Sequence, residues 1–102
     1  MTNVIDKFRA KIGEAAYTPG QVSEMLAYIG LGLHTSTDRI REYAKRHELY
    51  ANLKKLGIKP AGLSSTRYWI PKSNLVRIIE GLNIPVVIED LERAAQELNF
   101  QT

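Results

Sequence analysis

The sequence predicts a mainly α-helical domain that carries one small β-hairpin. Several stretches repeat apolar residues at the spacing of a helix face, with capping residues before them and glycine or proline after them. Residues 66–70 are instead β-branched and aromatic, which is typical of a strand. The chain has 102 residues, of which 44% are hydrophobic, so it is long enough to bury one modest core.

The N-terminal part of the chain predicts two helices. Residues 3–12 carry an apolar stripe at helical spacing, and Gly13 is expected to end that helix. The second helix is expected to begin at Thr18, a preferred N-cap, with proline next and Gln21 completing a capping box. Two glycines in residues 30–32 predict a turn after this helix, because glycine is costly inside a helix.

A further helix start follows at residues 35–38. Any of three hydroxyl side chains there can serve as the N-cap, and Asp38 suits the positive end of a helix. The helical pattern continues to residue 56, but its phase shifts after His47. The pattern leaves open whether residues 36–56 form one long helix or two helices broken near His47.

Residues 58–70 predict a short hairpin, whose second strand is stopped by Pro71. Ser73 is the expected N-cap of the next helix. That helix should end before Pro85, because a residue that precedes proline disfavours the helical region. A last helix is expected over about residues 85–98.

Basic side chains are concentrated in the middle of the chain. The net charge is only +3, but residues 39–77 hold ten basic and two acidic side chains, and five of the ten are arginines. Residues 78–102 hold one basic and five acidic side chains. This asymmetry favours one surface for a polyanion. The alternative is an ordinary solvated helix face, on which Glu42 and Arg46 pair four residues apart.

Two capped helices joined by a glycine turn, the second rich in arginine, are typical of a helix-turn-helix, and the hairpin would form its wing. The second helix of this motif lies in the major groove of DNA, with its N-terminal residues nearest the bases. Arginine binds guanine O6 and N7 or grips phosphates, and hydroxyl groups at the hairpin tip donate to phosphate oxygens. The fold class expected is therefore a winged helix-turn-helix, mainly α with a small β-hairpin wing.

Residues 17–26 (YTPGQVSEML) and 40–44 (IREYA) resemble the DNA-binding region of MerR-type regulators and of small phage and transposon excisionases. Residues 67–75 (RYWIPKSNL) resemble the wing and exit of the same superfamily. The resemblance covers about residues 17–82. It implies binding to duplex DNA as a dimer or cooperatively, DNA contacts from Arg41 and Tyr43, and a wing held on the backbone by Arg67.

This sequence departs from the family pattern in three places. The turn between Leu26 and Ile40 is several residues longer than in the family, and residues 46–56 are also expanded. No long dimerisation helix or effector domain follows, so we expect no small-molecule effector.

These considerations divide the chain into an N-terminal helical extension (1–16), a winged helix-turn-helix DNA-binding core (17–82) and a C-terminal helix (83–102) that packs on the core or mediates self-association. The expected DNA contacts are Thr37, Arg39, Arg41, Tyr43, Lys45, Arg46, Ser65, Arg67 and Lys72.

Catalytic and metal chemistry are not expected. The chain has no cysteine, and its two histidines have no acidic cluster beside them in the sequence. Neither a nucleophile elbow nor a pair of carboxylates placed for acid–base work is present. We therefore expect no enzyme activity, no cofactor and no metal site. No run of about 18 apolar residues predicts a membrane span, and the expected location is cytoplasmic and nucleoid-associated.

The function that the sequence favours is binding to double-stranded DNA, as a transcriptional regulator or as an excisionase-like or architectural accessory factor. The expected protein partner is a second copy of the chain, in a dimer or a cooperative assembly. The alternative is a winged-helix interaction or assembly module whose basic surface binds an acidic protein partner.

Overall fold

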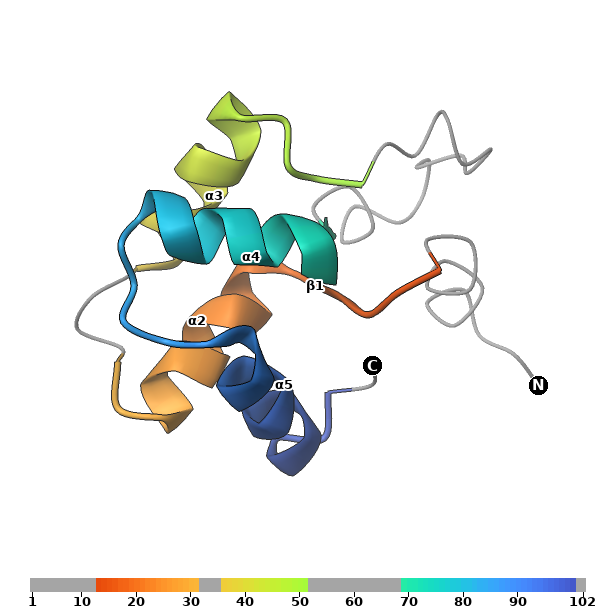
Figure 1. The fold of residues 1–102 in the computed structure, drawn as a ribbon, viewed down its shortest axis with the longest axis vertical. Helices are drawn as coiled ribbons and strands as arrows, with labels where there is room; N and C mark the ends of the chain where they lie inside the picture. The colour runs from red at the N-terminus through yellow and green to blue at the C-terminus, as the bar shows by residue number, and fades with distance from the viewer. Residues whose placement is uncertain (1–12, 32–35, 52–68, 101–102) are drawn as a thin grey trace.

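The computed structural model describes residues 13–31, 36–51 and 69–100. In order, these form β1 (Ala16–Tyr17), α2 (Pro19–Tyr28), α3 (Thr37–Arg46), β2 (Ile70–Pro71), α4 (Lys72–Gly81) and α5 (Ile88–Glu97). Figure 1 shows α3 at one end of the molecule and α5 at the other, with α2 and α4 between them. The mainly helical prediction is confirmed. The helix predicted over 3–12 and the hairpin residues 58–68 lie outside the described residues.

Helix α2 begins as its sequence predicts. The Thr18 hydroxyl accepts a hydrogen bond from the Gln21 backbone N–H at 3.1 Å, and the Thr18 N–H donates to the Gln21 side chain at 3.1 Å. This capping box satisfies N–H groups that have no partner inside the helix. The helix buries Val22, Met25 and Leu26.

Helix α3 begins one residue after Ser36, whose hydroxyl accepts from the Arg39 N–H at 3.2 Å. Of the three candidate hydroxyls, Ser36 is therefore the cap. The helix ends at Arg46, and Glu48 has a φ of 53°. A single helix to residue 56 is thereby excluded, and the break lies at His47.

All four described helices end in the same way. The residue two positions after the last helical one has positive φ in each case, and its N–H bonds back to the last turn of the helix. The next N–H donates to the carbonyl five residues earlier, and the side chain there is apolar and packs on the core. This is the Schellman motif, and it favours glycine or asparagine at the position of positive φ. The four residues are Gly30, Glu48, Asn83 and Asn99.

The two strands pair across a long sequence separation. Ala16 is opposite Pro71 and Tyr17 is opposite Ile70, in an antiparallel register. The second strand ends at Pro71, as predicted, but its described partner is β1, a segment in which no strand was expected. The Lys72 N–H extends the pairing by donating to the Ala15 carbonyl at 2.8 Å.

The prediction that Ser73 caps α4 is wrong. The cap position is Pro71, which has no side chain to accept a hydrogen bond. The carboxylate of Glu14 takes this role from outside the helix: it accepts from the Ser73 N–H at 2.6 Å and from the Ser73 hydroxyl at 3.2 Å. A negative charge is favourable at the positive end of a helix dipole.

One core joins every described element. Its buried side chains come from both strands, the four helices and the segments that follow α3 and α4: Tyr17, Val22, Met25, Leu26, Ile40, Ala44, Leu49, Ile70, Leu75, Ile78, Ile79, Ile84, Leu91, Ala94 and Ala95. Helix α5 begins at Ile88, three residues later than expected, and packs on α2. At this contact a hydrogen bond from the Tyr28 hydroxyl to Glu97, with the charge of that carboxylate, raises the pKa of Tyr28.

The helices of the described segments are all too short and too polar to cross a membrane.

The four helix ends predict opposite responses to two substitutions. A left-handed φ costs an ordinary residue about 1–2 kcal/mol, and the freedom of unfolded glycine offsets about half of this. Replacing Glu48 by glycine should therefore raise the free energy of unfolding by about 0.5–1 kcal/mol. Gly30→Ala should lower it by a similar amount, because a Cβ there meets no neighbouring atom and the cost is conformational alone. Urea denaturation measures both, and a destabilised Glu48→Gly variant would contradict this account.

Candidate nucleic-acid interface

The rotation of α3 about its own axis is set by two buried residues. Ile40 and Ala44 are both 0% exposed, and they lie one turn apart on the same side of the helix. The opposite side is exposed, and we call its residues the α3 face. They are Asp38, Arg39, Arg41, Glu42, Lys45 and Arg46.

The α3 face has three rows of side chains. Helical geometry places Asp38 and Glu42, four residues apart, in the middle row, opposite the buried pair. Arg41 and Lys45 form one flank. Arg39 and Arg46, seven residues apart, form the other. The face therefore presents a narrow acidic row between two basic flanks.

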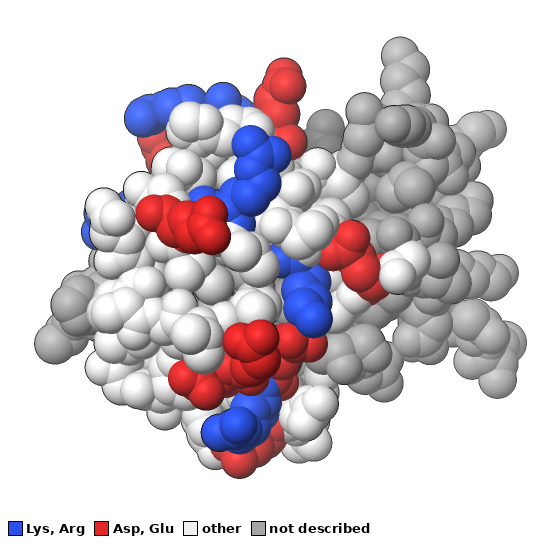
Figure 2. All heavy atoms as spheres, in the orientation of Figure 1, with Lys and Arg blue, Asp and Glu red and all other residues white. Residues whose placement is uncertain are grey.

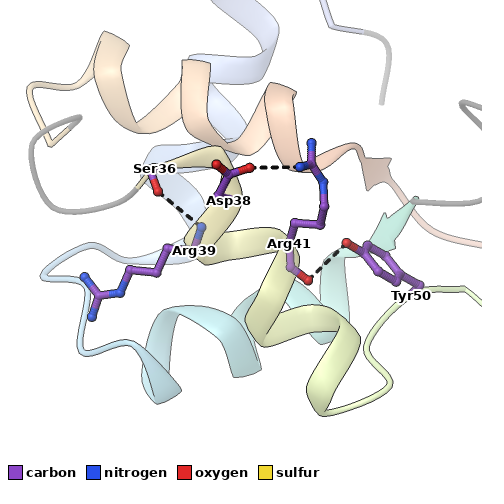
Figure 3. A network of polar contacts seen from close by, with 5 residues as sticks. All are labelled: Ser36, Asp38, Arg39, Arg41 and Tyr50. Atoms are coloured by element: carbon purple, nitrogen blue, oxygen red, sulfur yellow. Dashed lines mark hydrogen bonds and ion pairs between the residues drawn. The ribbon is translucent and has the colours of Figure 1, made fainter.

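The side chains of Arg39 and Arg41 extend in different directions from α3 (Figure 3). The Arg41 guanidinium contacts the Asp38 carboxylate at 2.9 Å, and the Tyr50 hydroxyl donates to the Arg41 carbonyl at 3.3 Å. Because the Arg41 and Asp38 side chains are 49% and 86% exposed, their ion pair adds little stability. Arg41 can exchange it for a phosphate or a base at small cost. The Glu42–Arg46 pair considered above is not among the ion pairs within the described segments.

Charge is separated between the two ends of the molecule. In Figure 2, blue side chains gather over α3 and the adjoining part of α4, with red ones among them, and red side chains predominate over α5. Helix α5 carries Glu89, Asp90, Glu92 and Glu97 against the single base Arg93. The acidic α5 therefore disfavours a polyanion, whereas at the α3 end the basic side chains are accompanied by the exposed acids Asp38, Glu42, Glu48 and Glu80.

Tyr43 sets the spacing between α3 and α4. Its side chain is half-buried against the core, and its ring centre lies 4.2 Å from that of His47. A Cβ built on Gly81, the last residue of α4, would overlap the Tyr43 hydroxyl and ring. Glycine at position 81 thus makes room for Tyr43 against α4. The DNA contact expected of Tyr43 stays a prediction.

The other predicted contacts are dispersed. Thr37 is the first residue of α3 and is half-buried. Lys72 begins α4, about 14 Å along that helix from Gly81, and its ammonium pairs with Glu92 of α5 at 3.0 Å. Ser65 and Arg67, the predicted wing contacts, lie outside the described residues.

Two residues that sequence analysis did not assign lie beside the α3 face. Arg77 of α4 is exposed, and with His47 and the acidic Glu80 it lines a surface depression next to Tyr43. Its place between the buried Leu75 and Ile78 indicates an outward side chain, but the sequence does not show that this part of α4 borders α3. Arg77 adds a basic side chain on a second helix, beside the acidic Glu80.

Within the described segments, no group of three or more histidine, aspartate or glutamate side chains is placed to hold a metal ion.

The chain has no significant match among protein-family models, curated proteins or solved structures. The resemblance to MerR-type regulators and excisionases, carried by residues 17–26, 40–44 and 67–75, therefore stays a prediction. The α3 face is the feature from which we infer function.

The contact between Tyr43 and α4 predicts the effect of a Cβ at position 81. Alanine is usually better than glycine in a helix by up to about 1 kcal/mol. Here the overlap with Tyr43 should reverse the sign, and Gly81→Ala should lower the free energy of unfolding by about 1–2 kcal/mol. The matched control is Gly20→Ala in α2, where the nearest atom is 3.9 Å away and no loss is expected. In a Tyr43→Leu background the penalty at Gly81 should vanish; a penalty that persists there would show that Tyr43 is not its cause.

Proposed function

We propose that this chain binds double-stranded DNA by placing α3 in the major groove. The supporting observation is the α3 face, on which four arginines and lysines lie on two flanks of one exposed helix. The major groove is about 12 Å wide and admits one α-helix, with a phosphate backbone on either side. Basic side chains on both flanks are suited to contact both backbones at once.

The energetics of such binding come mainly from the phosphates. Each arginine or lysine that neutralises a phosphate releases a condensed counterion, and this favours binding without regard to sequence. Arg77 and His47 extend the contact beyond α3, while the acidic α5 faces away from the DNA. In this proposal the hairpin predicted over 58–70 contacts the neighbouring backbone through Ser65 and Arg67.

We propose a non-catalytic role, as a transcriptional regulator or as an excisionase-like or architectural accessory factor associated with the nucleoid. We propose that the chain acts without a cofactor, metal or small-molecule effector, and as a dimer or cooperative assembly. Among the described residues, Tyr28 and Val87 are exposed large apolar side chains, at 51% and 57%, and we propose that they contribute to self-association.

Fluorescence anisotropy of a labelled random duplex of about 30 base pairs, titrated with protein at several salt concentrations, tests this proposal. Affinity should fall steeply with salt, and Lys45→Ala/Arg46→Ala should reduce the slope of log affinity against log salt by about two. Arg93→Ala on α5 is the matched control, because it removes the same kind of charge from the acidic end and should leave the slope unchanged.

Two results would contradict the proposal. If no duplex binds even at low salt, the chain is not a DNA-binding protein, and the same basic face would then favour an acidic protein partner. If Arg93→Ala weakens binding as much as the change on α3, the DNA lies elsewhere on the molecule.

A further inference from the structure

The middle row of the α3 face is acidic, although the face as a whole is basic. Asp38 and Glu42 are both exposed and lie between the flanks that would contact the two backbones. In a helix seated in the major groove, the middle row faces the base edges and the flanks face the phosphates. These two carboxylates are therefore placed where sequence is recognised.

The two carboxylates differ in what they already contact. Asp38 already contacts the Arg41 guanidinium at 2.9 Å, in the exposed and weak ion pair described above. Glu42 takes part in none of the ion pairs between described residues. Glu42 lies near the middle of the length of α3, and its exposed side chain is one methylene longer than that of Asp38. Of the two, Glu42 lies directly opposite the buried pair and has no ion pair with a described residue to give up before it takes a partner from DNA.

An ionised carboxylate only accepts hydrogen bonds, which restricts the bases that it tolerates. In the major groove guanine presents acceptors at O6 and N7, and thymine presents an acceptor at O4. Adenine presents an amino donor, but its N7 acceptor lies directly beside it. Cytosine presents an amino donor at N4 with no acceptor on the same major-groove edge. A carboxylate that must face base edges is therefore best satisfied by cytosine.

We propose that Glu42 is a specificity-determining residue, which accepts a hydrogen bond from the 4-amino group of a cytosine in the major groove while the basic flanks hold the phosphates. This inference rests on the proposed DNA-binding function. Sequences without a donor at that position leave the carboxylate facing acceptors, so Glu42 discriminates mainly by weakening binding to wrong sites.

Selection from a pool of duplexes with a randomised centre, followed by sequencing of the bound fraction, tests this role. The wild-type chain should enrich cytosine at one position. Glu42→Gln should change that position to adenine, because an amide both donates to N7 and accepts from N6. Glu42→Ala should lose the preference there and keep it elsewhere. Glu89→Gln, an exposed change on the acidic α5, is the matched control and should select the same sequences as wild type.

Two affinity measurements distinguish recognition of cytosine by Glu42 from a purely structural role of Glu42, because a structural role would change neither result. Removing the Glu42 charge should strengthen binding to random duplex several-fold, because a repulsive group leaves the interface. Replacing the selected cytosine by an analogue that lacks the 4-amino group should weaken wild-type binding about tenfold and leave Glu42→Ala binding unchanged.

The outcomes separate the two proposals. If wild type binds no duplex at low salt, both the DNA-binding function and the role of Glu42 are overturned. If wild type binds and selects a sequence, but folded Glu42→Gln and Glu42→Ala select the same one, the role of Glu42 alone is overturned.

Discussion

The burial of Ile40 and Ala44 is the constraint on which the rest of the account depends. Helix α3 is so polar that these are its only fully buried residues, and they fix which side of the helix meets α2 and α4. Rotation by one residue would bring Arg41 and Lys45, or Arg39, into the core, at a cost of several kcal/mol for each unpaired charge. Packing thus determines that both basic flanks and the acidic row point outward together. The burial of Ile40 and Ala44 therefore determines which charged side chains of α3 are exposed.

The position of α3 is held by contacts distant in sequence. Tyr43 rests against Gly81 of α4, and the Asn74 side chain donates to the Leu49 carbonyl at 2.8 Å, just after α3 ends. Helix α4 is fixed in turn through its own start, where Glu14 and Ala15 accept hydrogen bonds from Ser73 and Lys72. A segment near the N-terminus thereby orients the helix against which α3 packs. The pairing of β1 with β2 therefore helps to hold α4, and through α4 the position of α3, although neither strand belongs to the α3 face.

Local features could be predicted from the sequence, and non-local ones could not. The capping box at Thr18 and the polar face of α3 depend on residues within one or two turns, so spacing alone reveals them. The cap of α4 failed as a prediction because a carboxylate 59 residues away competes with Ser73 for the same role. Arg77 was missed for the same reason, since its significance comes from the helix beside it. The close approach of Tyr43 to Gly81 could not be predicted either, because it depends on a helix distant in sequence.

The most direct test of the central claim, that α3 is the element that meets DNA, is to map the contact on the intact chain. Nuclear magnetic resonance of the ¹⁵N-labelled protein, titrated with unlabelled duplex, reports the amide groups whose surroundings change. The account predicts the largest shift changes along α3 and near Arg77, with α5 almost unaffected. Largest changes on α5 or at the exposed Tyr28 and Val87 would contradict it, and would place the DNA contact at the opposite end of the molecule.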